Sequence, residues 1–153
     1  MIVLKRFQYG LETVLDYKTQ VLDNLRTEHA AALHQVRKKE DEIHRLKREL
    51  SGYEGQFDKK KHVGGVIEEY RLFSLCIAQM EKTIDYEKEH LFVLRKKEEE
   101  KRAKVVEAKI DTSKFEKLKE RKWTAWQKAE MKEEESFIEE FVSNGLSRRA
   151  EST

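Results

Sequence analysis

Apolar residues recur about every 3.5 residues along the first half of the chain. Steps that alternate between four and three residues connect Leu11, Leu15, Lys18, Leu22, Leu25, His29, Ala32, Val36, Lys39, Ile43, Leu46, Leu50, Tyr53 and Phe57. Only Lys18, His29 and Lys39 interrupt this series with a strongly polar side chain. A period of 3.5 keeps one stripe of a helix against a partner helix, so the pattern predicts a long helix in a left-handed coiled coil.

A second series with the same steps runs through the other half of the chain. It connects Val63, Val66, Tyr70, Phe73, Ile77, Met80, Ile84, Glu87, Leu91, Leu94, Glu98, Lys101, Val105, Ala108, Thr112 and Phe115. The stretch from Arg95 to Lys104 is charged on nearly every side. We therefore predict a second long helix whose middle is the least tightly packed part of the coiled coil.

Glycines separate the two series and predict a reversal of the chain. Gly52, Gly55, Gly64 and Gly65 flank a run of lysines at residues 59–61, and glycine clusters are typical of helix ends. The predicted fold is all-α, an antiparallel two-helix coiled-coil hairpin with a longer second helix. The segments expected are 1–57 for the first helix, 58–65 for the turn, 66–110 for the paired part of the second helix, 111–145 for a helical extension and 146–153 for a disordered tail. A reversal near residue 60 pairs residues whose numbers sum to about 120.

The segment after residue 110 changes character. Residues 111–113 are all potential helix-capping residues, and Ser113 and Glu116 have the spacing of a capping box. Beyond Phe115 the series loses its phase, and we expect the helix to have no partner within the chain there. The alternative is that a third helix starts at Ser113 and folds back on the hairpin.

Composition supports helices and limits the partners. Charged residues make up 41% of the chain and proline is absent, which favours long uninterrupted helices over a compact globular domain or a disordered chain. The 32 basic and 30 acidic residues alternate along the sequence, so no extended basic surface is expected to bind nucleic acid or anionic lipid. The apolar start, Met1 to Leu4, is too short for a secretory signal, and no stretch is long enough to insert into a membrane.

The sequence predicts no enzyme, no cofactor and no metal site. It contains no glycine-rich phosphate loop and no nucleophile elbow, and a two-helix hairpin offers no enclosed cavity for catalysis. Histidines 29, 34, 44, 62 and 90 are not spaced four apart on one helix face, so we interpret them as solvated or seam-edge residues. Cys76 is the lone cysteine; it is either a packed or a reactive thiol and suggests a cytosolic protein.

Two groups of aromatic residues are candidates for protein recognition. One group lies near the turn, where Tyr53, Phe57, Tyr70 and Phe73 are core residues of the seam or contacts for a partner. The other lies on the C-terminal arm, where Trp123 and Trp126 share a helix face and Phe137, Ile138 and Phe141 form a second patch. Large apolar side chains without an internal partner are typical of interfaces.

Three short motifs resemble the flagellar FliJ family. Residues 7–17, FQYGLETVLDY, resemble the opening of its members, an F-x-F/Y-x-L-x-x-V/L-L pattern followed by a long charged helix. Residues 70–73, with Ile77, Met80 and Ile84, are similar to the aromatic segment that follows the family's turn. Residues 137–141, FIEEF, are similar to the C-terminal tail of the family.

The resemblance implies a soluble component of the flagellar type III export apparatus. Members of that family are antiparallel coiled coils that resemble the central stalk of rotary ATPases. Their expected partners are the hexameric export ATPase, the cytoplasmic domain of the membrane export gate and unloaded export chaperones. The expected location is the cytoplasm, peripherally at the inner membrane beneath the flagellum, and the free hairpin is expected to be a monomer.

The resemblance also assigns residues to two surfaces. The residues expected to bind the export gate are Leu50, Tyr53, Phe57, Phe73, Ile77, Met80 and Ile84. The residues expected to enter the ATPase ring are Phe7, Leu11, Phe115, Leu118, Trp123, Trp126, Phe137 and Phe141. The equivalent stalk of a virulence-type secretion system and a generic coiled-coil scaffold, which would form a parallel homodimer, are the alternatives.

Overall fold

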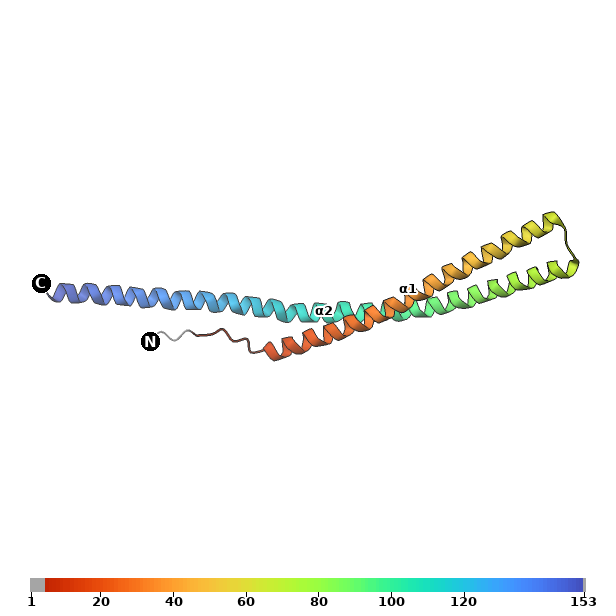
Figure 1. Ribbon diagram of the computed structural model, residues 1–153. Helices are drawn as coiled ribbons and strands as arrows, with labels where there is room; N and C mark the ends of the chain where they lie inside the picture. The colour runs from red at the N-terminus through yellow and green to blue at the C-terminus, as the bar shows by residue number, and fades with distance from the viewer. Residues whose placement is uncertain (1–4, 153) are drawn as a thin grey trace. The chain divides into compact units, whose positions relative to one another are not determined.

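The computed structural model describes residues 5–152 and contains two α-helices in that range (Figure 1). Helix α1 spans Glu12–Val63 and helix α2 spans Ile67–Glu151. The two helices form an antiparallel hairpin in which α2, at 85 residues, is longer than α1, at 52 residues. The predicted fold class is confirmed; the parts of the predicted segments that fall on residues 1–4 and 153 lie outside the described residues.

The reversal is shorter than predicted and lies later in the sequence. Residues 58–63, predicted to belong to the turn, continue α1, because their lysines are good helix formers and no proline interrupts them. Gly64 has a φ of 86°, and its amide donates to the Lys60 carbonyl at 3.0 Å, which is a glycine helix cap. Only residues 64–66 separate the two helices. Gly52 and Gly55 lie inside α1.

The C-terminal part of the chain is one continuous helix. Helix α2 has no break at Ser113, so the alternative third helix does not form. Helix α2 also continues through residues 146–151, where the sequence predicted a disordered tail. No proline stands in this stretch, and Leu146, Arg148, Arg149 and Ala150 are good helix formers.

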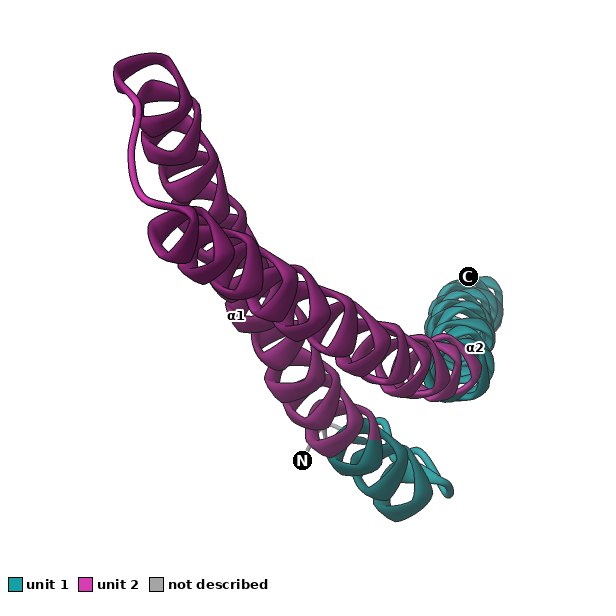
Figure 2. Cartoon of the chain, turned by 90° about the vertical axis from the view of Figure 1, so that its right-hand side faces the viewer, with its two compact units in different colours: residues 1–21, 108–153 teal, residues 22–107 magenta. Residues whose placement is uncertain are grey.

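The chain divides into two compact units, which are described separately (Figure 2). One unit, residues 22–107, contains the turn and the stretches of α1 and α2 next to it. The other unit contains residues 1–21 and 108–153, and so both ends of the chain.

In the turn-containing unit the helices meet along the predicted seam. Leu22, Val36, Ile43, Ile84 and Leu91 are buried, with exposed fractions of 4–8%. The other predicted seam positions of this unit are half-buried, except Tyr53, Val63 and Val66, which are exposed. A single helix pair therefore covers one stripe of each helix, as the 3.5-residue period predicted.

Polar seam residues pair with each other across this unit. Lys39 Nζ lies 2.5 Å from Glu87 Oε2, and His29 Nε2 lies 2.8 Å from Glu98 Oε1. Each of these pairs has residue numbers that sum to 126 or 127, so the predicted sum of about 120 was wrong. The observed sum is larger by about one heptad, because the chain reverses after Val63 and not near residue 60.

The charged stretch from Arg95 to Lys104 is tied to α1 by ion pairs at its edges. Arg95 pairs with Glu40 at 3.0 Å, and Lys101 pairs with Glu28 at 2.8 Å. The hydrogen bond and charge of Lys101 lower the pKa of Glu28 from its ordinary value of 4.5.

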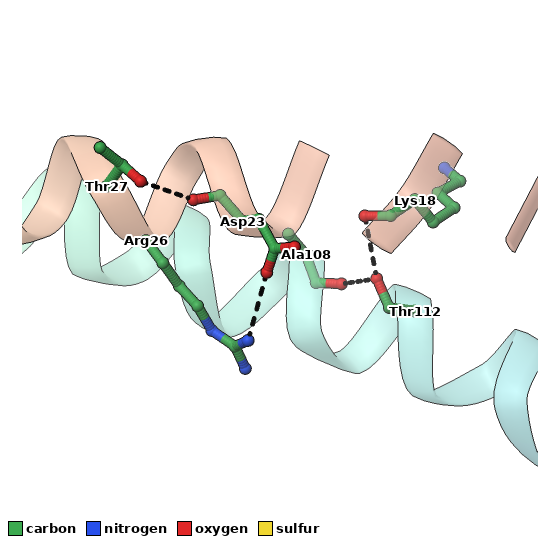
Figure 3. Close-up of polar contacts among 6 residues, drawn as sticks. All are labelled: Lys18, Asp23, Arg26, Thr27, Ala108 and Thr112. Atoms are coloured by element: carbon green, nitrogen blue, oxygen red, sulfur yellow. Dashed lines mark hydrogen bonds and ion pairs between the residues drawn. The ribbon is translucent and has the colours of Figure 1, made fainter. Parts of the chain in front are cut away.

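In the unit that contains the chain ends, Thr112 is the most buried polar residue, with 3% of its surface exposed. Its hydroxyl donates to the Ala108 carbonyl at 2.8 Å and also lies 3.4 Å from the Lys18 carbonyl (Figure 3). Next to it Lys18 pairs with Asp111 at 2.6 Å, and the hydrogen bond that Lys18 donates to this carboxylate raises the pKa of Lys18. The cluster at residues 111–113 therefore packs α2 against α1 and does not cap a helix.

We predict that Glu87→Ala lowers the free energy of unfolding by about 1–3 kcal/mol, because Lys39 would remain in the seam without its cross-helix partner. The side chain of Lys39 is only 15% exposed. Glu49→Ala is the matched control, because Glu49 forms an exposed ion pair within α1 with Arg45, and it should change stability by about 0.5 kcal/mol or less. Urea unfolding followed by circular dichroism measures the free energy of unfolding of both variants. Equal losses of stability would contradict the role of Glu87 as the seam partner of Lys39.

We also predict that the hairpin loses stability in acid. The pKa values of Glu28 and Glu42 are lowered in the folded chain, mainly by hydrogen bonds from Lys101 and Lys39. A lowered pKa contributes stability that is present above the ordinary value of 4.5 and is lost as the pH falls through the folded value. Thermal unfolding across this range should show a falling midpoint. The fall should be weaker in Glu28→Gln than in Glu54→Gln, a control at an exposed position of α1.

Candidate interaction surfaces

The residues predicted to bind the export gate lie on the facing sides of α1 and α2 near the turn. We call this group the turn surface; it consists of Leu50, Tyr53, Phe57, Phe73, Ile77, Met80 and Ile84. Leu50, Phe57, Phe73, Ile77 and Met80 are half-buried. Tyr53 is 43% exposed, whereas Ile84 is only 4% exposed. Ile84 is therefore part of the core, and its substitution is expected to act through stability.

Aromatic rings hold the turn surface together. The Phe57 ring stacks on Phe73 with 5.6 Å between ring centroids, and meets Tyr70 edge-on at 6.0 Å. Lys61 Nζ lies 4.1 Å from the centroid of Phe57, within the range of a cation–π contact. The Tyr70 hydroxyl donates to the Lys60 carbonyl at 3.2 Å. Phe57, Tyr70 and Phe73 are all half-buried, so the surface serves both as core and as a candidate contact.

Sequence reasoning missed a second apolar face of α2 in this unit. Leu72, Leu75, Tyr86 and Val93 are 48–68% exposed, and their spacing places them on one side of α2, away from the seam. The signal was present in residues 70–78, where apolar side chains occur on every side of the helix. A heptad series describes only one stripe of a helix, so it does not reveal this second face.

In the unit with the chain ends, residues 5–11 pack along α2, and we call them the strap. Phe7 meets the Trp123 ring edge-on at 5.2 Å and lies 5.9 Å from Trp126, and the two tryptophan rings stack at 5.3 Å. Trp123 remains 41% exposed, and Trp126 is half-buried. Three predicted ring-binding residues are thus brought into one aromatic cluster.

Polar contacts fix the strap on both sides of this cluster. Tyr9 is 7% exposed, and its hydroxyl donates to the Phe115 carbonyl at 3.1 Å. Lys119 pairs with Glu12 at 2.7 Å, at the start of α1. Lys122 Nζ lies 5.9 Å from the centroid of Tyr9. Further out, Lys5 pairs with Glu133 at 3.5 Å.

The strap contradicts the prediction that α2 has no partner within the chain just beyond Phe115, whereas Phe137 and Phe141 are exposed. The segment of α2 from Phe115 to Trp126 was predicted to have no partner within the chain, and this was wrong, because the strap covers it. Leu11 is half-buried and Leu118 is 36% exposed. The exposed fractions of Phe137 and Phe141 are 70% and 73%. Phe7 and Tyr9, two aromatic residues before the first helix, are the sequence signal for the strap.

Residues 5–152 were compared with the requirements of a metal site and of a membrane-spanning helix. No group of three or more His, Cys, Asp or Glu in this range is placed to hold a metal ion. Neither described helix contains an apolar window long enough to cross a bilayer. Cys76 is exposed, which contradicts its interpretation as a packed thiol.

A match to one protein family identifies the family of the chain. The family description "Flagellar FliJ protein" matches residues 7–151, nearly the whole of the 153-residue chain. The chain belongs to the flagellar FliJ protein family. Comparisons with curated proteins and with solved structures gave no match. The match covers the strap, both helices and the turn.

FliJ membership makes the chain a component of flagellar protein export. The family is one of non-catalytic export components, which is compatible with the prediction that the chain is not an enzyme. The helical hairpin and the interaction surfaces described above are therefore interpreted as parts of a protein that works through contacts with other export components.

We predict that Phe7→Ala shifts the tryptophan emission to longer wavelength. The chain has only two tryptophans, and both contact the Phe7 ring, so removing the ring exposes both to water. Phe92→Ala is the control, because Phe92 is 61% exposed and lies in the other unit. Emission that is unchanged in Phe7→Ala, or shifted equally in both variants, would contradict the packing of the strap.

Proposed function

We propose that the chain is the central stalk of the flagellar export ATPase and links the ATPase ring to the export gate. Family membership over residues 7–151 is the observation that carries this proposal. The antiparallel hairpin supports it, because a helix pair closed within one chain needs no second copy to bury its seam. A generic scaffold built as a parallel homodimer would bury the same stripe between two chains instead.

The proposed ring-binding end is the unit that contains both chain ends. Phe7, Trp123 and Trp126 form a partly exposed aromatic cluster there, and Phe137 and Phe141 are exposed further along α2. Aromatic residues dominate the binding energy of many protein interfaces, particularly tryptophan and tyrosine. Basic residues surround the cluster, including Lys117, Lys119 and Lys122, so the complementary surface of the ring should be acidic at its rim.

The proposed gate-binding end is the turn surface. Tyr53, Phe57 and Phe73 offer accessible ring edges supported by a packed helix pair, which lowers the entropic cost of binding. Ile84 supports this surface from the core and is not expected to touch the gate itself.

Coupling between the two ends is the proposed mechanism. Contacts that differ between the states of the ATPase ring bias one state over another, and a helix pair transmits this difference to the gate. We further propose that the chain escorts unloaded export chaperones and works in the cytoplasm, peripherally at the inner membrane. Contact with chaperones is assigned to no particular residue.

The direct test mixes the purified chain with the flagellar export ATPase and measures hexamer formation and ATP turnover. The wild-type chain should raise both. Trp126→Ala should weaken binding about tenfold or more, because an aromatic hot spot contributes about 2 kcal/mol or more, and Phe7→Ala should also weaken it. Phe92→Ala, in the other unit, should bind like wild type. A chain without effect on the ATPase, or variants that stimulate as fully as wild type, would reject the stalk role.

A further inference from the structure

One groove of the turn-containing unit is lined by residues of both helices and belongs to neither of the surfaces described above. Its volume is about 540 Å³. Ile43 and Leu91 line it, and both are buried members of the core cluster. Phe92 lines it as well and is 61% exposed. The groove therefore combines apolar residues that are fixed by the core with one large ring that is open to solvent.

The polar residues of this groove are mostly basic, so we call it the basic groove. Lys47 of α1 and Lys88 of α2 line it, together with His44 and Arg95. Glu40 is the one carboxylate among the described residues that line it, and Glu40 already pairs with Arg95 at 3.0 Å. The two lysines are exposed. A bound group of negative charge would therefore meet no unpaired carboxylate of the groove itself.

The lysines of the basic groove lack carboxylate partners of their own. Within residues 5–152 the side chains of Lys47 and Lys88 form no ion pair or hydrogen bond. Lys96, about one turn beyond Phe92, places its ammonium nitrogen 5.0 Å from the centroid of that ring, within the range of a cation–π contact. By contrast, Lys39 in the seam of the same unit has two carboxylate partners. The positive charge of the groove is thus left for a group outside the described chain.

Carboxylates limit the length of the basic stretch. On α2, steps of seven residues lead from Phe92 back to Asp85 and forward to Glu99, and residues seven apart lie on nearly the same side of a helix. Glu89 is not among the described residues that line the groove. The basic stretch covers residues 88–96, which is about 12 Å of helix. Nucleic acids and anionic membranes bind to more extended basic surfaces, so a short protein segment fits this groove better.

We propose that the basic groove binds a short acidic segment of a partner protein, with one large apolar side chain of that segment packed on Phe92 and its carboxylates beside Lys47 and Lys88. Charge complementarity selects this occupant, because the unpaired lysines attract carboxylates and the exposed ring supplies apolar contact area. This inference goes beyond the proposed function, because the groove shares no residue with the turn surface or with the proposed ring-binding residues.

A second copy of the chain is the competing occupant. Glutamates at residues 133–135, 139 and 140 stand beside the exposed Phe137 and Phe141 in the sequence, so this stretch of α2 has similar chemistry. A contact between the groove of one copy and this stretch of the next would be heterologous, and such contacts build rings or filaments and not a closed pair. We therefore assign the groove to a different protein, and the test separates the two occupants.

The test titrates the full-length chain with a peptide in which a Leu-Phe pair stands between two runs of three glutamates, and follows the backbone amide signals by NMR. The signals of residues around Lys47, Lys88 and Phe92 should shift. A peptide with glutamine in place of every glutamate should bind at least about tenfold more weakly, because it lacks the attracting charges. Absence of shifts at these residues, or equal binding of the two peptides, would overturn the proposal. A single-stranded DNA oligonucleotide that shifts the same signals as strongly as the glutamate peptide would also overturn it, by showing a general polyanion surface.

Two charge-reversed variants locate the site. K47E/K88E should bind the glutamate peptide at least about tenfold more weakly than wild type, because attraction becomes repulsion. K59E/K97E is the matched control, because it changes the net charge equally at two exposed positions. Lys59 lies about three turns from Lys47 on α1, and Lys97 projects from the side of α2 opposite Lys88, so this variant should bind like wild type. Equal binding by the two variants would contradict the assignment to the groove, and circular dichroism verifies that both are folded.

Sedimentation equilibrium of the chain alone tests the competing occupant. Wild type and K47E/K88E should both sediment as monomers. Association of the wild-type chain that is lost in K47E/K88E and in F137S/F141S would assign the groove to a second copy and overturn the proposal. None of these measurements contains the export ATPase, so their failure is distinguishable from failure of the stalk role.

Discussion

Polar residues inside the seam fix the register of the helix pair. An apolar stripe with a heptad period can slide by one heptad and still bury similar side chains, whereas a charged side chain in the seam needs its partner at one position. Lys39 and Glu87 meet at one level of the turn-containing unit, and His29 and Glu98 meet at another. A shift by one heptad would leave all four side chains without these partners. The pairing therefore selects one alignment among several with similar apolar burial.

Closing the seam within one chain determines which surfaces remain for partners. Each helix buries one stripe, so aromatic and aliphatic residues on other sides stay accessible. Near the turn, the ring of Phe57 belongs to the seam and to the surface at the same time. At the chain ends, the strap takes the place of α1 and packs Phe7 on the two tryptophans. This FliJ protein therefore carries one group of accessible apolar residues in each of its two units.

The sequence predicted much of this arrangement, because heptad periodicity is a local property. Leu22, Val36, Ile43 and Leu91 were assigned to the seam from spacing alone, and all are buried. Positions of the candidate contacts were less predictable. Phe7 was recognised as part of a family motif, yet its contact with Trp123 joins residues far apart in the sequence and depends on a non-helical segment that has no period. Periodicity also could not distinguish one glycine as the cap among the several between the two series.

By itself, the sequence determined the helices, the seam and the antiparallel hairpin, because these follow from the spacing of apolar residues and the absence of proline. Tertiary structure decided the register, the continuity of α2 beyond Ser113 and the covering of its aromatic residues by the strap. The register depends on which charged side chains meet across the seam, and the strap depends on contacts between Tyr9 and Phe115 that no local pattern encodes. Local propensity acts between residues a few positions apart, whereas these decisions compare free energies of whole alternative packings.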